Sequence, residues 1–271
     1  MSATIHIAAA STSGQHAAKG NCSNCTLKQL CLPLGMAEAD VVRLDKIIGR
    51  RRRVARDEPL FHVDQPFRNL YAVRFGHFKT LRLNFHGHEQ ITGFQMAGEL
   101  LGMDGIGNGS HHCDAVALED SEVCEIPYEQ LEVLIGQVPQ LLHHFHRIMS
   151  QEIMREQNVM QLLGSMRAEQ RFAIFLLNLG ARYAARGYSA NAFQLRMSRE
   201  DIGNYLGLTI ESISRLISKF KKVNLIRVGN RDIELIDRAT LTSVAAGMSS
   251  VDAPAAAPAP ARQGLHLAFA A

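Results

Sequence analysis

Three cysteines lie close together near the start of the chain, and their spacing could hold a metal centre. Cys22, Cys25 and Cys31 form a Cys-x2-Cys-x5-Cys run, and the 271 residues contain five cysteines in all. Thiolates are soft ligands that select zinc, copper(I) or iron–sulfur clusters. Zinc and cubane iron–sulfur sites both take a fourth ligand, for which Cys113 and Cys124 are the candidates. The spacing leaves zinc and iron–sulfur equally open, with unligated buried thiols as a third alternative.

The composition argues against disulfides as the use of these cysteines. The chain is 46% apolar and 20% charged, with 21 glycines and 8 prolines, which excludes collagen-like and wholly disordered classes. The first 19 residues lack the basic start and apolar block of a secretory signal. No apolar run approaches the roughly 20 residues of a membrane span. We therefore expect a cytoplasmic protein with no membrane partner, in a reducing compartment where disulfides are rare.

A second group of residues, near the C-terminus, has the pattern of a helix-turn-helix. Within residues 197–217, Ser198 can cap a first helix and Thr209 a second one. Gly203 is small where two helices must cross closely, and Gly207 supplies the turn between them. The alternative is a helical hairpin that binds no DNA.

The exposed face of the second helix predicts contacts with double-stranded DNA. Glu211, Ser214 and Arg215 stand at i, i+3 and i+4 and project together. Arginine matches guanine, glutamate matches cytosine, and serine can contact a base or a phosphate. Lysines at 219, 221 and 222 follow, and residues 225–235 predict a two-stranded wing. Residues 165–240 hold 13 basic and 7 acidic side chains, against 15 and 18 in residues 1–164, which also favours a polyanionic partner for this part.

The region before these helices has the periodicity of strands. Between about 58 and 127, apolar and polar residues alternate, as in Tyr71–Phe75 and Leu81–Phe85, and turns at Gly76-His77 and His86-Gly87 separate the runs. Short strands joined by glycine-containing turns predict an antiparallel roll or sandwich.

A long helix is expected to follow the strands and to join two chains. From Pro139 to about Leu163 no further proline occurs, which predicts one helix of roughly 25 residues. A narrow seam at heptad positions a and d indicates a parallel dimer coiled coil. The seam comprises Leu142, His146, Met149, Ile153, Glu156, Met160 and Leu163. Glu156 is unusual there, because two-fold symmetry sets two carboxylates against each other, unless the seam is drawn one position off and Glu156 is solvated.

These patterns predict an α+β fold in five parts. We expect a flexible N-terminus (1–20), the cysteine segment with an antiparallel β-roll sensor domain (21–137) and a dimerisation helix (138–164). A winged helix-turn-helix DNA-binding domain (165–240) and a disordered Ala/Pro-rich tail (241–271) complete the chain.

Four stretches give the chain a family resemblance. They are CSNCTLKQLCLPLGM (22–36), EQITGFQMAGELLGMDGIG (89–107), VCEIPYEQL (123–131) and REDIGNYLGLTIESISRLISKF (199–220). From about Cys22 to Leu235 the chain resembles the FNR type of oxygen-sensing regulator in the cyclic AMP receptor protein/FNR superfamily. The resemblance implies a transcription regulator without enzymatic activity. Such a regulator binds an inverted-repeat, TTGAT-like site as a homodimer and controls genes of anaerobic metabolism.

The resemblance also implies a cofactor and its ligands. In the family, the N-terminal cysteines and one distant cysteine before Glu-Ile-Pro hold a [4Fe–4S] cluster, which here selects Cys22, Cys25, Cys31 and Cys124. Cys113 is then a bystander. The intact cluster favours the DNA-binding dimer, and oxygen converts it to [2Fe–2S], after which the dimer separates. Glu156 matches the position where an acidic residue, aspartate in the best-known members, keeps the cluster-free protein monomeric.

Other ligands and partners can be weighed in the same way. His111 and His112 stand where nucleotide-binding members have an Arg-Ser pair, so we expect no cyclic nucleotide, because imidazoles replace the fixed guanidinium donor. Loops around Phe85–Glu89 resemble the face that contacts RNA polymerase. Two rival interpretations are a ferredoxin-like electron carrier and a regulator with a structural zinc ion.

Overall fold

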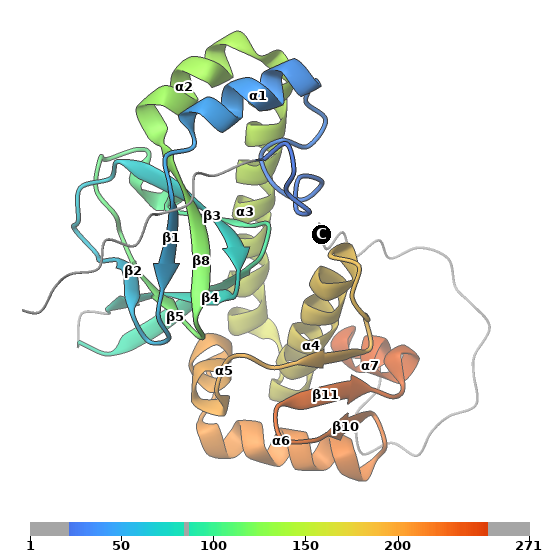
Figure 1. Cartoon of the computed structure of the whole chain (residues 1–271). Helices are drawn as coiled ribbons and strands as arrows, with labels where there is room; N and C mark the ends of the chain where they lie inside the picture. Colours follow the sequence, from blue (N-terminus) through green and yellow to red (C-terminus); the bar gives the residue numbers. More distant parts are fainter. Residues whose placement is uncertain (1–21, 84–86, 249–271) are drawn as a thin grey trace, which may run out of the picture.

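The computed structural model describes residues 22–83 and 87–248, which form two packed parts on either side of one long helix (Figure 1). The first part contains α1 (Glu38–Ile47), β1 (Arg51–Val54), β2 (Pro59–Phe61), β3 (Asn69–Phe75), β4 (His77–Leu83), β5 (Glu89–Met96), β6 (Leu100–Leu101), a 3-10 helix (Met103–Gly105), β7 (Asp114–Ala117), β8 (Ser121–Pro127) and α2 (Tyr128–Gln137). The long helix is α3 (Pro139–Ser165). The second part contains α4 (Ala168–Ala185), β9 (Ala192–Gln194), α5 (Arg199–Leu206), α6 (Ile210–Lys222), β10 (Ile226–Val228), β11 (Asp232–Leu235) and α7 (Arg238–Ala245).

The strands of the first part form the antiparallel roll that the alternating pattern predicts. Two four-stranded sheets, in the orders β1-β8-β3-β6 and β2-β7-β4-β5, enclose a core that includes Phe61, Val73 and Phe78. At the turn between β3 and β4, Gly76 has a φ of +87°, and a Cβ there would meet the side chain of Ser121. The α+β fold class is therefore confirmed, with a roll, a long helix and a C-terminal helix-turn-helix.

The roll begins earlier in the chain than the alternating pattern indicates. Strand β1 pairs with β8 from Arg51 opposite Cys124 to Val54 opposite Ser121. Three consecutive arginines in β1 hide the apolar alternation, because one side chain of this strand, Val54, is buried in the core. The strand is defined by its partner and not by its own composition.

Helix α3 spans the molecule and connects both parts. It begins with Pro139 in its first turn, where the missing N–H of proline costs nothing. Its first turns pack with α1, α2 and the roll in a second core that includes Leu44, Leu131, Leu141 and Phe145. Its last turns reach the helix-turn-helix through Leu162.

The second part is a winged helix-turn-helix, and it extends beyond the expected boundary at residue 240. Strands β10, β11 and β9 form one antiparallel sheet beside helices α4 to α7. The tail expected from residue 241 is wrong for its first residues, because α7 buries Leu241 and Val244 against this domain. Residues 1–20, and the tail from residue 249, lie outside the described residues. Within the described ranges, no helix is both long and apolar enough to cross a membrane.

Candidate functional site

The fold brings four of the five cysteines to one pocket. Cys22, Cys25 and Cys31 lie on the loop before α1, and Cys124 lies on β8, between β1 and β3. All four line the same cavity, together with apolar side chains from the loop, α1 and the sheet and with the basic residues Lys28, Arg51 and Arg74. Residues about 100 positions apart therefore share one site, in the combination that the resemblance implies.

Hydrogen bonds fix the cysteine loop at both ends. The Asp45 carboxylate on α1 accepts hydrogen bonds from the backbone N–H of Cys22 and from the N–H and hydroxyl of Ser23. At the other end, Nε2 of His144 on α3 lies 3.0 Å from the carbonyl oxygen of Cys31. The Arg147 guanidinium donates to Nδ1 of the same ring at 2.9 Å, so Nε2 carries the proton and donates to Cys31.

Without a bound cation, the pocket favours neutral thiols. Burial raises the pKa of Cys31 to about 12, and the neighbouring Cys124 and Cys25 add to the increase while a backbone hydrogen bond from Leu32 opposes it. Burial also raises the pKa of Cys22 and of Cys124. Arg51 and Arg74, which also line the pocket, oppose the increase at Cys124. Several thiolates can share this pocket if further positive charge enters with them, which iron or zinc would supply.

Cys113 lies in a different environment from the other four cysteines. It is buried in the core between the two sheets, and its thiol donates to the Asp104 carboxylate at 3.4 Å. Across residues 22–83 and 87–248, no three His, Cys, Asp or Glu side chains are close enough to hold a single metal ion. The four pocket cysteines thus surround a common space without converging on one point.

The helix-turn-helix has the local geometry that its residues predict. Ser198 Oγ accepts from the backbone N–H of Asp201 at 3.0 Å, and the Asp201 carboxylate accepts from the Ser198 N–H at 2.9 Å. Thr209 caps α6 by accepting from the Ser212 N–H at 3.2 Å. A Cβ on Gly203 would stand 2.7 Å from the Leu208 carbonyl oxygen, and Gly207 has a φ of +63°. Both glycines are therefore required where the two helices meet.

The predicted base-reading residues lie on the outer face of α6. Glu211 and Arg215 are exposed, and Ser214 is half-buried because Arg199 of α5 approaches its hydroxyl at 3.4 Å. Lys221 and Lys222 are exposed near the end of the helix. This face can present donors and acceptors to a DNA groove, and Arg199 is a neighbour that the sequence pattern did not single out.

Arg171 of α4 fixes this domain to the end of α3. Its guanidinium donates to the carbonyl oxygens of Met166 and Leu163 at 2.9 Å and of Leu206 at 3.0 Å. The end of α5 and the end of α3 are thereby joined by one side chain. Movement of α3 would move the helix-turn-helix with it.

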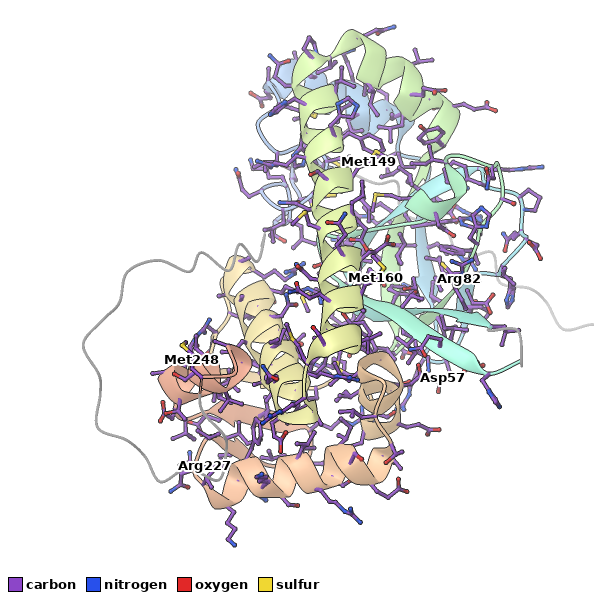
Figure 2. All side chains as sticks on the ribbon, turned by 180° about the vertical axis from the view of Figure 1, so that it is seen from behind. Asp57, Arg82, Met149, Met160, Arg227 and Met248 are labelled. Atoms are coloured by element: carbon purple, nitrogen blue, oxygen red, sulfur yellow. The ribbon has the colours of Figure 1, made fainter. Side chains whose placement is uncertain are left out.

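Most of the predicted seam lies uncovered along α3 (Figure 2). Leu142, Ile153 and Met160 are 38%, 53% and 67% exposed, which is high for large apolar side chains. His146 and Glu156 are exposed too, whereas Met149 and Leu163 are half-buried against the cores of the roll and the helix-turn-helix.

His111, one of the two histidines that bear on nucleotide binding, is packed inside the roll. Its ring is 1% exposed and stacks on Phe61 with centroids 3.8 Å apart. Nδ1 lies 3.4 Å from the Asp104 carboxylate, which also accepts from the His112 N–H at 2.6 Å. The His111 ring is thus held in place by the core of the roll.

Comparisons with known proteins agree with this architecture. Residues 51–137 match the cyclic nucleotide-binding domain, and residues 170–244 match the Crp-like helix-turn-helix domain. The chain is 48% identical to the transcriptional regulatory protein btr of Bordetella pertussis over 80% of this chain and 90% of that protein. It is 43% identical to the fumarate and nitrate reduction regulatory protein of Escherichia coli over 83% and 90%. The solved structure of FixK2 from Bradyrhizobium japonicum has a TM-score of 0.66 at 30% identity, covering 76% of this chain and 98% of that one.

A β-roll, a connecting helix and a winged helix-turn-helix, together with relatives that are regulators, define a DNA-binding transcription regulator and not an enzyme. The sequence similarity to the two regulators named above extends over 90% of each of them. The chain belongs to the Crp/FNR family.

Proposed function

We propose that this chain is an oxygen-responsive transcription regulator that holds a [4Fe–4S] cluster on Cys22, Cys25, Cys31 and Cys124. The observation that supports this proposal is the pocket lined by these four thiols, three from one loop and one from the central region of a sheet. One relative is named for fumarate and nitrate reduction. This name supports genes of anaerobic metabolism as the targets that we propose for this chain.

The four thiols provide the ligand set that a cubane cluster takes. In a cubane, each cysteine binds a different iron, so four thiols lining one pocket could occupy its corners. A structural zinc could use the same four thiols, and the family resemblance is the reason that we propose iron. When bound, the cluster would supply positive charge and a link between loop and sheet that oxygen destroys by converting it to [2Fe–2S].

The chain's own residues would pass this change to α3. The His144–Cys31 bond attaches the cysteine loop to the helix that carries the exposed seam. We propose that the loaded protein is a homodimer along this seam, with Glu156 of each copy opposing the other. Repulsion between the two carboxylates makes the dimer weak, so that loop order decides between monomer and dimer.

The dimer would read an inverted repeat on double-stranded DNA. Two copies of α6 related by a two-fold axis meet half-sites about one helical turn apart. Glu211, Ser214 and Arg215 would contact the bases of a TTGAT-like half-site, since they share the exposed face of α6. RNA polymerase is a further proposed partner, through the loop around Phe85–Glu89, of which residues 84–86 lie outside the described chain.

Anaerobic purification of paired cysteine variants tests the cluster. Wild type and Cys113→Ser should be brown, contain about four iron and four sulfide per chain, and bleach in air. Cys124→Ser should lose the colour and most of the iron, because it removes a ligand from the pocket and not from the core. Colourless wild type with about one zinc per chain would refute the cluster and favour the zinc-containing regulator.

A further inference from the structure

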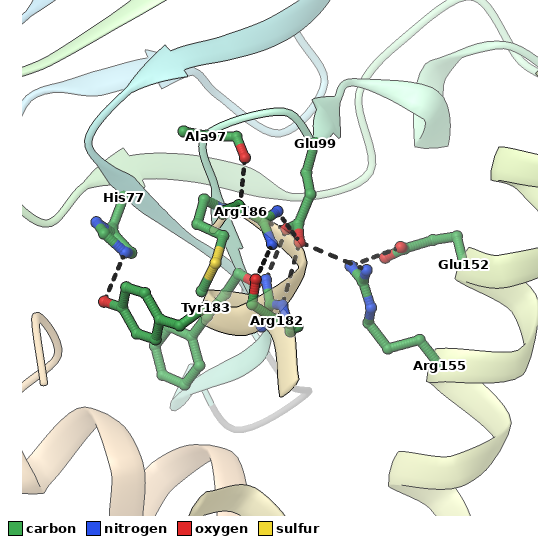
Figure 3. Close-up of polar contacts among 10 residues, drawn as sticks. His77, Ala97, Glu99, Glu152, Arg155, Arg182, Tyr183 and Arg186 are labelled. Carbon is green, nitrogen blue, oxygen red and sulfur yellow. Dashed lines mark hydrogen bonds and ion pairs between the residues drawn. The ribbon is translucent and has the colours of Figure 1, made fainter. Parts of the chain in front are cut away.

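One half-buried carboxylate joins the roll to the DNA-binding domain (Figure 3). Glu99, in the turn between β5 and β6, accepts from Arg182 of α4 at 2.6 Å and from Arg186, just after α4, at 2.7 Å. Arg155 of α3 approaches the same carboxylate at 3.9 Å and pairs with Glu152 at 2.8 Å. Three elements that belong to different parts of the molecule thus meet at Glu99.

The charges at this junction are tightly held. Burial alone would raise the pKa of Glu99, but the guanidinium groups of Arg182, Arg155 and Arg186 outweigh burial and hold the pKa well below its usual range. Arg182 and Arg186 are also anchored to the roll's backbone. Arg182 donates to the Phe94 carbonyl oxygen, and Arg186 to that of Ala97, each at 2.6 Å. Bonds this specific fix an orientation, because they are lost if α4 rotates by a small angle.

The surrounding contacts give the junction a matching interface. Lys79 of β4 bonds to Asp201 of α5 at 2.7 Å, and Asn204 of α5 accepts from the Ile91 N–H at 2.6 Å. Phe94 of β5 packs against Tyr205 of α5, with ring centroids 5.1 Å apart. Helix α5, the first helix of the helix-turn-helix, is therefore seated on the β4–β5 hairpin of the roll.

The same turn touches the cysteine loop on its other side. Gly98 has a φ of +91°, and a Cβ built there would stand 2.9 Å from Cβ of Leu30. Leu30 precedes Cys31, and Gly98 precedes Glu99. The Leu30–Gly98 contact therefore lies next to Cys31, a proposed cluster ligand, on one side and next to Glu99, which binds α4, on the other.

We propose that Glu99 is a positioning residue for DNA recognition: it holds α5 and α6 at the angle to α3 that lets two copies read both half-sites, and its turn transmits the state of the cysteine loop to them. This inference rests on the proposed function and adds a route from loop to DNA that does not pass through the dimer seam. Glu99 itself lies in the roll, between β5 and β6, and would act through Arg182 and Arg186.

The variant Glu99→Gln separates positioning from simple electrostatics. Removing a negative charge makes the protein more basic, so long-range attraction to phosphates would tighten DNA binding. Loss of the fixed orientation predicts the opposite, a fall of about tenfold or more in affinity for an inverted repeat. Affinity for a scrambled duplex should stay equal or rise slightly, because the phosphate contacts remain.

The experiment compares wild type, Glu99→Gln, Glu99→Asp and Glu58→Gln as loaded, anaerobic full-length proteins. Glu58 is the control for net charge, because its exposed carboxylate accepts from the Ala55 N–H at 2.8 Å within the roll and does not line the cysteine pocket. Iron content, sedimentation and binding to both duplexes are measured on the same samples. Glu99→Asp, which retains the carboxylate, should recover part of the specific affinity, and Glu58→Gln should behave as wild type. Hydrogen exchange should speed up at α4 and β5 in Glu99→Gln while the α5–α6 amides stay protected.

The outcomes distinguish this inference from the proposed function. If wild type without a cluster binds the repeat as well as loaded protein does, the proposed function is wrong. If wild type behaves as proposed but Glu99→Gln binds the repeat equally well, positioning by Glu99 is wrong. A Glu99→Gln protein that loses iron or dimer in proportion to DNA affinity would show a general structural role and would also overturn the inference.

A second pair of variants tests the link to the cysteine loop. Gly98→Ala forces a Cβ against Leu30, whereas Gly109→Ala introduces the same left-handed strain, at φ +74°, with no atom of the described residues within 4 Å. Gly98→Ala should lower specific DNA affinity and shorten cluster lifetime in air together. Equal behaviour of the two alanine variants would contradict the link.

Discussion

Replacing His144 by leucine should loosen the cysteine loop without altering a thiol. The ring is 6% exposed and bonds to the Cys31 carbonyl oxygen at 3.0 Å and to Arg147 at 2.9 Å. Leucine fills similar space but leaves the carbonyl oxygen without its donor, which costs about 1–3 kcal/mol for a buried group. Arg147 is exposed and can turn to water, so its loss adds little. We take about 2 kcal/mol as the expected cost, which raises the fraction of open loop by roughly thirtyfold.

Thiol labelling measures this opening directly. In the reduced, cluster-free protein, Cys31 is half-buried in the pocket and its pKa is raised to about 12, so we expect a disulfide reagent to react with it mainly after the loop opens. Its labelling rate should rise by roughly tenfold or more in His144→Leu. The matched control is His143→Leu, at an exposed neighbouring position on the same helix. Equal Cys31 labelling rates in wild type and both variants would refute the role assigned to the His144–Cys31 bond.

Three further predictions concern the seam, the reading face and the junction. Glu156→Ala should make dimerisation largely independent of oxygen, since it removes the opposed carboxylates, and sedimentation of aerobic variant as monomer alone would count against the seam. Arg215→Ala should cost about 1–3 kcal/mol at its guanine and relax preference there; a wild type and variant that bind specific and scrambled duplexes equally would contradict it. Burial raises the pKa of Asp201, but bonds from Lys79 and Ser198 lower it below its usual value. The ionised Asp201 therefore contributes its full stabilisation above about pH 4. This stabilisation is lost as the pH falls through the lowered pKa that Asp201 has in the folded protein. Asp201→Asn should flatten the acid side of a stability–pH curve measured by urea unfolding, and an unchanged slope would show that another carboxylate dominates.

The helix-turn-helix could be predicted from the sequence because its signals are local. Ser198 and Asp201 are three residues apart, and so are Thr209 and Ser212, so each cap is visible as a pair in the chain. Gly203 and Gly207 mark the crossing and the turn by their type alone. The boundary at residue 240 is not visible in the composition, because α7 crosses it and buries Leu241 and Val244 in the core of the DNA-binding domain.

The fourth cysteine could not be chosen from spacing. Cys113 and Cys124 are both remote from the N-terminal run, and resemblance was the basis for preferring Cys124. Strand pairing is what brings Cys124 to the loop pocket, because β8 places this residue opposite Arg51 and Ala72. Cys113 instead lies in the core between the sheets, against Asp104. Register across three strands decides this, and register is not visible in one strand.

Glu99 shows the same limit for charged residues. Its carboxylate binds arginines that stand 83 and 87 positions further on in the chain. Non-local ion pairs leave no periodic signature, since each partner is an ordinary charged residue in its own segment. The folded chain is needed to see that they meet.

The basic composition of residues 165–240 therefore overstates the charge that faces DNA. Arg182 and Arg186 neutralise Glu99, Arg171 donates to three backbone carbonyls, and Lys219 pairs with Glu169 at 3.3 Å. Phosphates would meet exposed side chains such as Arg215, Lys221 and Lys222. Several cations that suggested DNA binding instead orient the helices that bind it. A charge asymmetry along a sequence can thus indicate a polyanionic partner, although many of the cations that create the asymmetry form pairs inside the protein. For this reason, the direction in which Glu99→Gln changes DNA affinity distinguishes a change of orientation from a change of net charge.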